Sequence, residues 1–115
     1  MKDFSIATNH DNRIEAFYIG KGGTVMHAWQ LDSGDKTSWS SSEKLFGVNS
    51  TGSNLPLTGA TDVEACTDSN GQIHVIAHTK DSADGMNKTF HTCYQVPEGG
   101  VWHGWYKIVQ DKSPI

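Results

Sequence analysis

The chain contains two similar halves. Three segments of the first half return in the second: "ATNHDNRIEAF" (7–17) as "CTDSNGQIHVI" (66–76), "VMHAWQ" (25–30) as "FHTCYQ" (90–95), and "SWSSSEKLFG" (38–47) as "VWHGWYKIVQ" (101–110). They recur in the same order at offsets of 59, 65 and 63, which indicates an internal duplication with loops of different length. Repeat units bury their apolar faces against their neighbours, and about three or more are usually needed for a stable array. Two copies are therefore expected to need further neighbours.

Each half is expected to form four β-strands. The segments are rich in aromatic and β-branched residues, and Gly-, Asn- and Asp-containing turns separate them. The expected strands are 4–9, 13–19, 24–31 and 38–46, then 61–67, 72–79, 88–96 and 101–109. No segment has a convincing helical period of 3.6. The sequence predicts an all-β fold in a single domain over residues 1–115, with one repeat at 4–47, an inter-repeat linker at 48–60 and a second repeat at 61–110.

Composition limits the classes of function. A chain of 115 residues with 36% hydrophobic residues and 12 glycines suits one turn-rich domain. No hydrophobic run is long enough to span a bilayer, and no signal-peptide pattern follows "MKDFS". Localisation therefore stays open between the cytoplasm and release without a classical signal. The net charge of −4, with nine scattered Lys and Arg, forms no basic stripe, so a nucleic-acid partner is not expected.

The two cysteines are expected to remain unpaired. Cys66 and Cys93 fall on the first and third strands of the second half. In an up-and-down sheet these strands are two spacings of about 4.8 Å apart, beyond the usual limit of about 7 Å between bridged Cα atoms. Because they match Ala7 and Ala28 of the first half, both are predicted to be small buried thiols.

Tandem four-stranded units marked by tryptophan are typical of β-propeller blades. The stretch "NHDNRIEAFYIGKGGTVMHAWQ" followed by "SWSSSEKLFG" resembles the repeat of bacterial PLL-type β-propeller lectins, whose blades carry N-x-D-G-R-L-E-V-F, L-x-H-x-W-Q and W-x-x-W-x-x-L-G. The likeness is closer over 4–47 than over 61–110. It implies a carbohydrate-binding lectin with two four-stranded antiparallel blades per chain and sugars, fucose- or galactose-type monosaccharides among them, held between blades.

The resemblance also implies an assembly, and the departures from it affect the sites. Two blades per chain would require oligomerisation to complete a propeller; a trimer or tetramer is favoured and a dimer is the remaining option. Asn12 replaces a family Gly and Ser42 replaces the second Trp of the closing motif. In the second half His74, Thr92 and Tyr94 stand where the first has Glu15, His27 and Trp29. The two clefts are therefore expected to be unequal, with the better site in the first half.

Sugar binding requires an aromatic ring for the apolar C–H face of a pyranose, beside planar donors and acceptors for its hydroxyls. Trp39 and Trp102 open the last strand of each half, where a ligand could reach them, whereas Trp29 and Tyr94 are interpreted as wedges between blades. Arg13 and Glu15 share one strand face. The predicted ligand-binding set is Arg13, Glu15, His27, Gln30, Trp39, Gln95, Trp102 and Trp105.

No pattern points to catalysis, a metal or a cofactor. His74 and His78 share a strand face but are about 13 Å apart at about 3.3 Å per residue, too far to hold one ion. "DSGDKTSW" (32–39) is similar to the Asp-box turn of sialidase propellers, but Trp39 comes two residues too late. A non-enzyme is predicted, with glycans or monosaccharides and further copies of the chain as partners. The alternative is a non-catalytic structural or protein-recognition propeller module without a sugar site.

Overall fold

The computed structural model describes residues 3–48, 54–80, 88–96 and 101–111. The predicted all-β class is confirmed. The first half contains β1 (Phe4–Thr8), β2 (Ile14–Ile19), the 3-10 turn η1 (Lys21–Gly23), β3 (Val25–Asp32), β4 (Asp35–Trp39), β5 (Glu43–Lys44) and β6 (Phe46–Val48). The remaining strands are β7 (Asn54–Pro56), β8 (Ala60–Thr67), β9 (Ile73–Lys80), β10 (Lys88–Val96) and β11 (Val101–Asp111). In the described residues no helix is long and apolar enough to cross a membrane.

The strands form two open sheets. The first has the order β1-β2-β3-β4, with β5 also paired to β3, and the second has the order β7-β6-β11-β10-β9-β8. Neighbouring strands run antiparallel except β6 and β11, which are parallel. The four strands expected in the second half are present as β8 to β11. The segment expected to be a linker contributes β7.

The single strand predicted over 38–46 is wrong as one element. The chain pairs with β3 through β4 and again through β5, and β6 then joins the second sheet. Between β4 and β5 the hydroxyl of Ser40 accepts a hydrogen bond from the backbone N–H of Trp29 at 3.0 Å, and the Ser40 N–H donates to the carbonyl of Trp29 at 2.8 Å. Serine side chains in this stretch can hydrogen-bond to nearby backbone groups in place of a neighbouring strand, and this interrupts the ladder.

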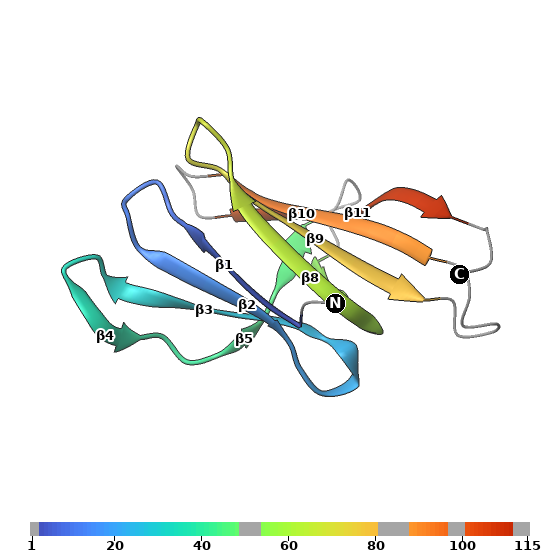
Figure 1. Ribbon diagram of the computed structural model, residues 1–115, viewed down its shortest axis with the longest axis horizontal. Coiled ribbons are helices and arrows are strands. Elements are labelled where there is room, and N and C mark those ends of the chain that lie inside the picture. Colours follow the sequence, from blue (N-terminus) through green and yellow to red (C-terminus); the bar gives the residue numbers. More distant parts are fainter. Residues whose placement is uncertain (1–2, 49–53, 81–87, 97–100, 112–115) are drawn as a thin grey trace.

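The two sheets pack face to face, as Figure 1 shows with β1 beside β8. Strand alternation turns one side of each sheet inward, and these sides supply most of the buried apolar residues. The core consists of Ala7, Phe17, Val25, Leu45, Ala60, Val63, Ile73, Val75, Ala77, Cys93 and Trp102. At its centre the rings of Phe17 and Trp102 meet edge to face, with centroids 5.7 Å apart. The core therefore lies between the halves and belongs to both.

Hydrogen bonds also join the halves. The Ala65 N–H donates to the Ser5 hydroxyl at 3.0 Å, and the Thr67 hydroxyl donates to the carbonyl of Thr8 at 2.7 Å. These bonds fix the register of β8 along β1.

A glycine contact allows β6 to reach β11. A Cβ on Gly47 of β6 would lie 2.6 Å from backbone atoms of Gly104 in β11, closer than such atoms approach. Because backbone cannot move aside as the end of a long side chain can, this position needs a residue without a side chain. Gly47 thus permits the last strand of the first half to join the sheet of the second.

The cysteines agree only in part with the prediction. Both are free. Cys93 lies in the core, but Cys66 is exposed because it points to the outward side of the second sheet, paired with His74. The prediction that both thiols are buried is therefore wrong for Cys66 in the single chain.

Candidate ligand site between the two sheets

A pocket of about 320 Å³ lies where the two sheets meet. This volume is at the low end of the roughly 300 to 1,000 Å³ of small-molecule sites, so it suits a ligand of one ring. Its lining comes from six strands of both halves and from the turn before β2: Arg13, Glu15, His27, Trp29, Glu43, Phe46, Gln95 and Trp102.

Three aromatic side chains form the apolar walls. Trp102 is only 8% exposed and meets the His27 ring edge to face, with centroids 6.0 Å apart. The half-buried Trp29 also approaches the His27 ring, with the centroids 5.0 Å apart. Phe46, at 42% exposure, stands nearer to solvent. Rings at different depths give the pocket both an interior wall and an accessible one.

Glu15 and His27 form a buried polar pair in the pocket. Glu15 is paired with Trp29, and His27 with Phe17, along β2 and β3, so these side chains share the inward face. A Glu15 carboxylate oxygen lies 2.7 Å from Nδ1 of His27, and the other accepts a 3.2 Å hydrogen bond from the Asn9 amide. Glu15 is 3% exposed, so these partners replace the water lost on burial. With Nδ1 engaged, Nε2 is the His27 nitrogen that can meet a ligand.

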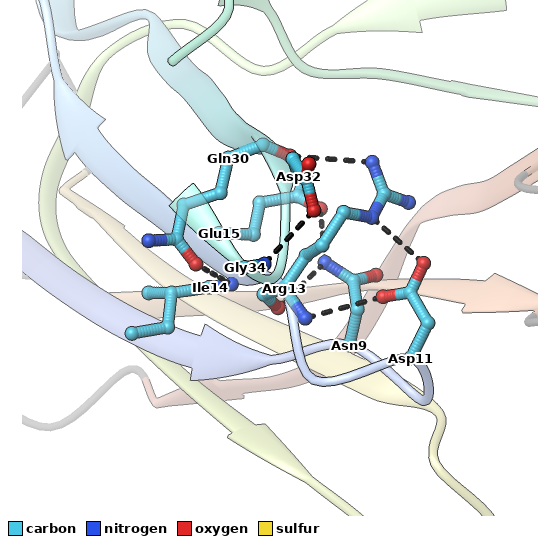
Figure 2. Close-up of polar contacts among 8 residues, drawn as sticks. All are labelled: Asn9, Asp11, Arg13, Ile14, Glu15, Gln30, Asp32 and Gly34. Atoms are coloured by element: carbon cyan, nitrogen blue, oxygen red, sulfur yellow. Dashed lines mark hydrogen bonds and ion pairs between the residues drawn. The ribbon is translucent and has the colours of Figure 1, made fainter. Parts of the chain in front are cut away.

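Arg13 is held at the rim by its neighbours (Figure 2). Its Nε donates to Asp11 at 2.7 Å, and its Nη1 donates to the carbonyl of Gln30 at 3.3 Å. Burial acts to raise the pKa of Asp11, but the hydrogen bonds and charge of Arg13 outweigh it and hold that pKa below its usual value. The fork of Arg13 is therefore oriented by an ionised carboxylate while part of it remains available for a ligand.

The turn before β2 is built as the sequence suggested. Asp11 accepts a hydrogen bond from the Arg13 N–H at 3.2 Å, and the Asn9 amide donates to the carbonyl of Arg13 at 3.3 Å. Asn12 has a φ of 70°, a left-handed conformation that Asn tolerates better than most residues. The turn therefore accommodates Asn12 where the lectin repeats have Gly.

Five residues of the predicted set line the pocket: Arg13, Glu15, His27, Gln95 and Trp102. Gln30 does not, because its side chain is 1% exposed and accepts a 2.8 Å hydrogen bond from the Ile14 N–H (Figure 2). Trp39 pairs with Gln30 on the opposite side of the first sheet and is 40% exposed. The Trp105 indole donates to the carbonyl of Leu45 at 3.1 Å and packs against the core.

Three lining residues were not in the predicted set. Trp29, interpreted from the sequence as a wedge, reaches the pocket as well as the His27 ring. Glu43 enters because β5 pairs it directly with His27, a contact that the register of a fourth strand could have indicated. Phe46 enters because β6 leaves the first sheet, and no local pattern signals that crossing.

The residues of the second half that match Glu15, His27 and Trp29 in the repeat do not line this pocket. His74, Tyr94 and His103 lie together on the outward side of the second sheet, with Tyr94 stacked against His74 at 6.1 Å and against His103 at 5.4 Å. Nε2 of His74 is 2.8 Å from a carboxylate oxygen of Asp68. That bond and the Gln72 N–H hold the pKa of Asp68 below its usual value.

The pocket offers donors, acceptors and aromatic faces but no cluster suited to a metal. In the part of the chain that the structure describes, no three His, Cys, Asp or Glu side chains are grouped so as to hold an ion. The chain matches no protein-family model, and a comparison with curated proteins found no similar one.

Proposed function

We propose that the chain binds carbohydrate in the pocket between its two sheets. The observation that carries the proposal is the convergence there of aromatic walls with a guanidinium, two carboxylates, an imidazole and an amide. An aromatic face accepts the C–H side of a pyranose, and the planar polar groups match its hydroxyls. The volume fits one sugar ring rather than an oligosaccharide.

The polar groups divide by depth. Glu15 has both oxygens occupied by His27 and Asn9, so it orients the imidazole more than it contacts a ligand. Arg13, through the part of its fork that remains available, and Glu43 lie nearer to solvent and supply a donor and an acceptor for neighbouring hydroxyls. The proposed role is binding without catalysis.

The face-to-face sheets support a propeller architecture for the complete assembly. Neighbouring propeller blades pack in this manner, and the site at their junction agrees with sugars bound between blades. Further copies would complete the ring, with a trimer or tetramer favoured. Several pockets on one ring would raise the avidity for a multivalent glycan surface.

Glycan-array binding followed by titration with free methyl glycosides tests this function. We expect Glu43→Gln to weaken the binding of the best glycoside by about 5- to 30-fold, since a charge-assisted hydrogen bond contributes roughly 1 to 2 kcal/mol there. Asp3→Asn, which removes an exposed carboxylate outside the pocket, is the control and should bind normally. A folded wild-type chain that binds no glycan would contradict the proposal and favour the protein-recognition alternative.

A further inference from the structure

Because the two halves are copies, each sheet face that packs at the junction has a counterpart face on the other sheet. In the first sheet the outward residues Phe4, Ile6, Ile14, Ala16, Ala28 and Trp39 occupy the positions of Val63, Ala65, Ile73, Val75, Cys93 and Trp102. The second group forms the inward side of the second sheet and packs on the first sheet. The outward side of the first sheet is thus a second version of a surface already covered within the chain.

The second sheet shows the reciprocal relation. Its outward residues Cys66, His74, Ile76, Thr92, Tyr94 and Tyr106 occupy the positions of Ala7, Glu15, Phe17, His27, Trp29 and Glu43. Register confirms that they share one face, because Cys66 pairs with His74 and Thr92 pairs with both Ile76 and Tyr106. This face matches the inward side of the first sheet.

Both outward faces carry apolar side chains in solvent. Phe4 is 55%, Ile6 52% and Ile76 42% exposed, whereas Phe17, which occupies the position of Ile76, is 0% exposed. Exposed apolar residues that gather on one face mark interaction surfaces rather than ordinary monomer surface. By analogy with the junction inside the chain, the surface that fits each outward face is the other outward face.

We propose that the outward face of the second sheet packs on the outward face of the first sheet of a second copy, and that this junction forms a second binding pocket shared by two chains. In this pocket one chain supplies Tyr94 in the place of Trp29. The same chain supplies Tyr106 in the place of Glu43 and His74 in the place of Glu15. The partner's Trp39 takes the place of Trp102 and completes the aromatic wall. Only the nature of the ligand depends on the proposed carbohydrate function.

The shared pocket differs chemically from the first. Gln72 replaces Arg13 and Tyr106 replaces Glu43, so a neutral amide and a hydroxyl stand in place of two charged groups. Thr92 replaces His27. His74 stands in the position of Glu15 and pairs with Asp68, just as Glu15 pairs with Asn9, the counterpart of Asp68. Tyr94, stacked between His74 and His103, offers a preordered ring. Such a pocket suits a neutral pyranoside bound mainly by stacking, more weakly than in the first pocket.

The thiol of Cys66 reports on the junction without any ligand. It is exposed in the single chain but occupies the position of Ala7, which is 8% exposed between the sheets. We expect its rate of labelling by a maleimide to fall roughly tenfold at chain concentrations where about 90% is assembled, with sedimentation measuring the assembled fraction. Ile6→Lys should abolish the protection, whereas Leu55→Lys, at a similarly exposed site on β7 (57% against 52%), should not. A monodisperse monomer at micromolar concentration, or an assembly with fully reactive Cys66, overturns the junction.

Complementation between two variants tests whether the pocket spans two chains. Titrations with methyl glycosides of neutral hexoses should find two sites per chain for the assembled wild type and one each for Trp39→Ala and Tyr94→Ala, with sedimentation confirming assembly of both variants. In an equal mixture, about a quarter of the junctions pair an intact Trp39 with an intact Tyr94, so the weaker class of site should reappear at that level. A mixture without that class overturns the shared pocket.

The two proposals fail separately. If Cys66 is protected but the wild type binds one glycoside per chain, the shared pocket is wrong and the carbohydrate function stands. If Cys66 is protected and no glycoside binds, the carbohydrate function and the ligand of the shared pocket are both wrong, and the junction stands.

Discussion

The side chain of Glu15 shows how a residue predicted for one role takes another. Glu15 lies within an apolar strand, where burial of a carboxylate without a partner is costly, so a bound ligand was the expected partner. The partners are His27 and Asn9, which belong to other segments of the same half. Alternation along β2 predicted which way Glu15 points, but the occupancy of its oxygens depends on a turn and a neighbouring strand. The residue therefore matters for stability as well as for the site.

Removal of the Glu15 charge is expected to destabilise the fold. Glu15→Gln keeps the shape but loses the charge-assisted bond to His27, so the free energy of unfolding should fall by about 1 to 3 kcal/mol. Glu43→Gln, at an exposed site, should change it by less than about 0.5 kcal/mol. Urea denaturation followed by tryptophan fluorescence measures both values. Equal stability of the two variants would contradict the structural role of the pair.

The two thiols are expected to react very differently in the monomeric chain. Burial raises the pKa of Cys93 from 9.0 to about 12, so its thiol stays protonated, whereas Cys66 is exposed. A thiol-disulfide reagent at pH 8 should modify Cys66 readily and Cys93 only on unfolding.

Because the pKa of Cys93 is raised in the folded state, the contribution of its thiol to the free energy of unfolding is full below pH 9.0 and is lost as the pH approaches 12. Cys93→Ala should reduce this loss of stability at alkaline pH. In the labelling experiment, fast modification of Cys93 in the folded chain would show that it is not buried.

At the scale of elements, the sequence predicted the strands whose pattern is local. Alternation and turn residues located β1 to β3 and β8 to β11 within a few residues, and the duplication supported them. The fourth strand of the first half was placed wrongly because its pairing changes partway, from β3 to β11. Pairing partners are a tertiary property, and the residue that permits the change, Gly47, reads in sequence as an ordinary strand glycine.

Gly47→Ala tests the crossing of β6. The added methyl would meet the Gly104 backbone, so we expect the free energy of unfolding to fall by about 1 to 3 kcal/mol, as for overpacked sites. Gly34→Ala is the matched control, since its methyl would approach only a side-chain oxygen of Asp32 at 3.4 Å. Thermal unfolding compares the two variants. A Gly47 variant as stable as the Gly34 variant would mean that β6 and β11 separate at little cost.

At the scale of the whole molecule, the pocket combines parts that the sequence presents far apart. Arg13, Glu15 and His27 were predicted as one group because they match motif positions in the first half. Trp102 and Gln95 were assigned to the other half, yet the packing of the sheets brings them to the same pocket. The sequence could identify both sets of residues but not which side of one half faces which side of the other, because that choice depends on sheet packing.

The parallel pairing of β6 with β11 has a consequence for how the chain folds. It joins Val48 to His103, so an edge of the second sheet cannot form until most of the chain is available. The inter-sheet bond between Ser5 and Ala65 spans a similar separation. Contacts so distant in sequence must close long loops before they contribute, which slows folding relative to a pair of independent hairpins. The halves, although copies of one another, are thus expected to fold in a single cooperative transition.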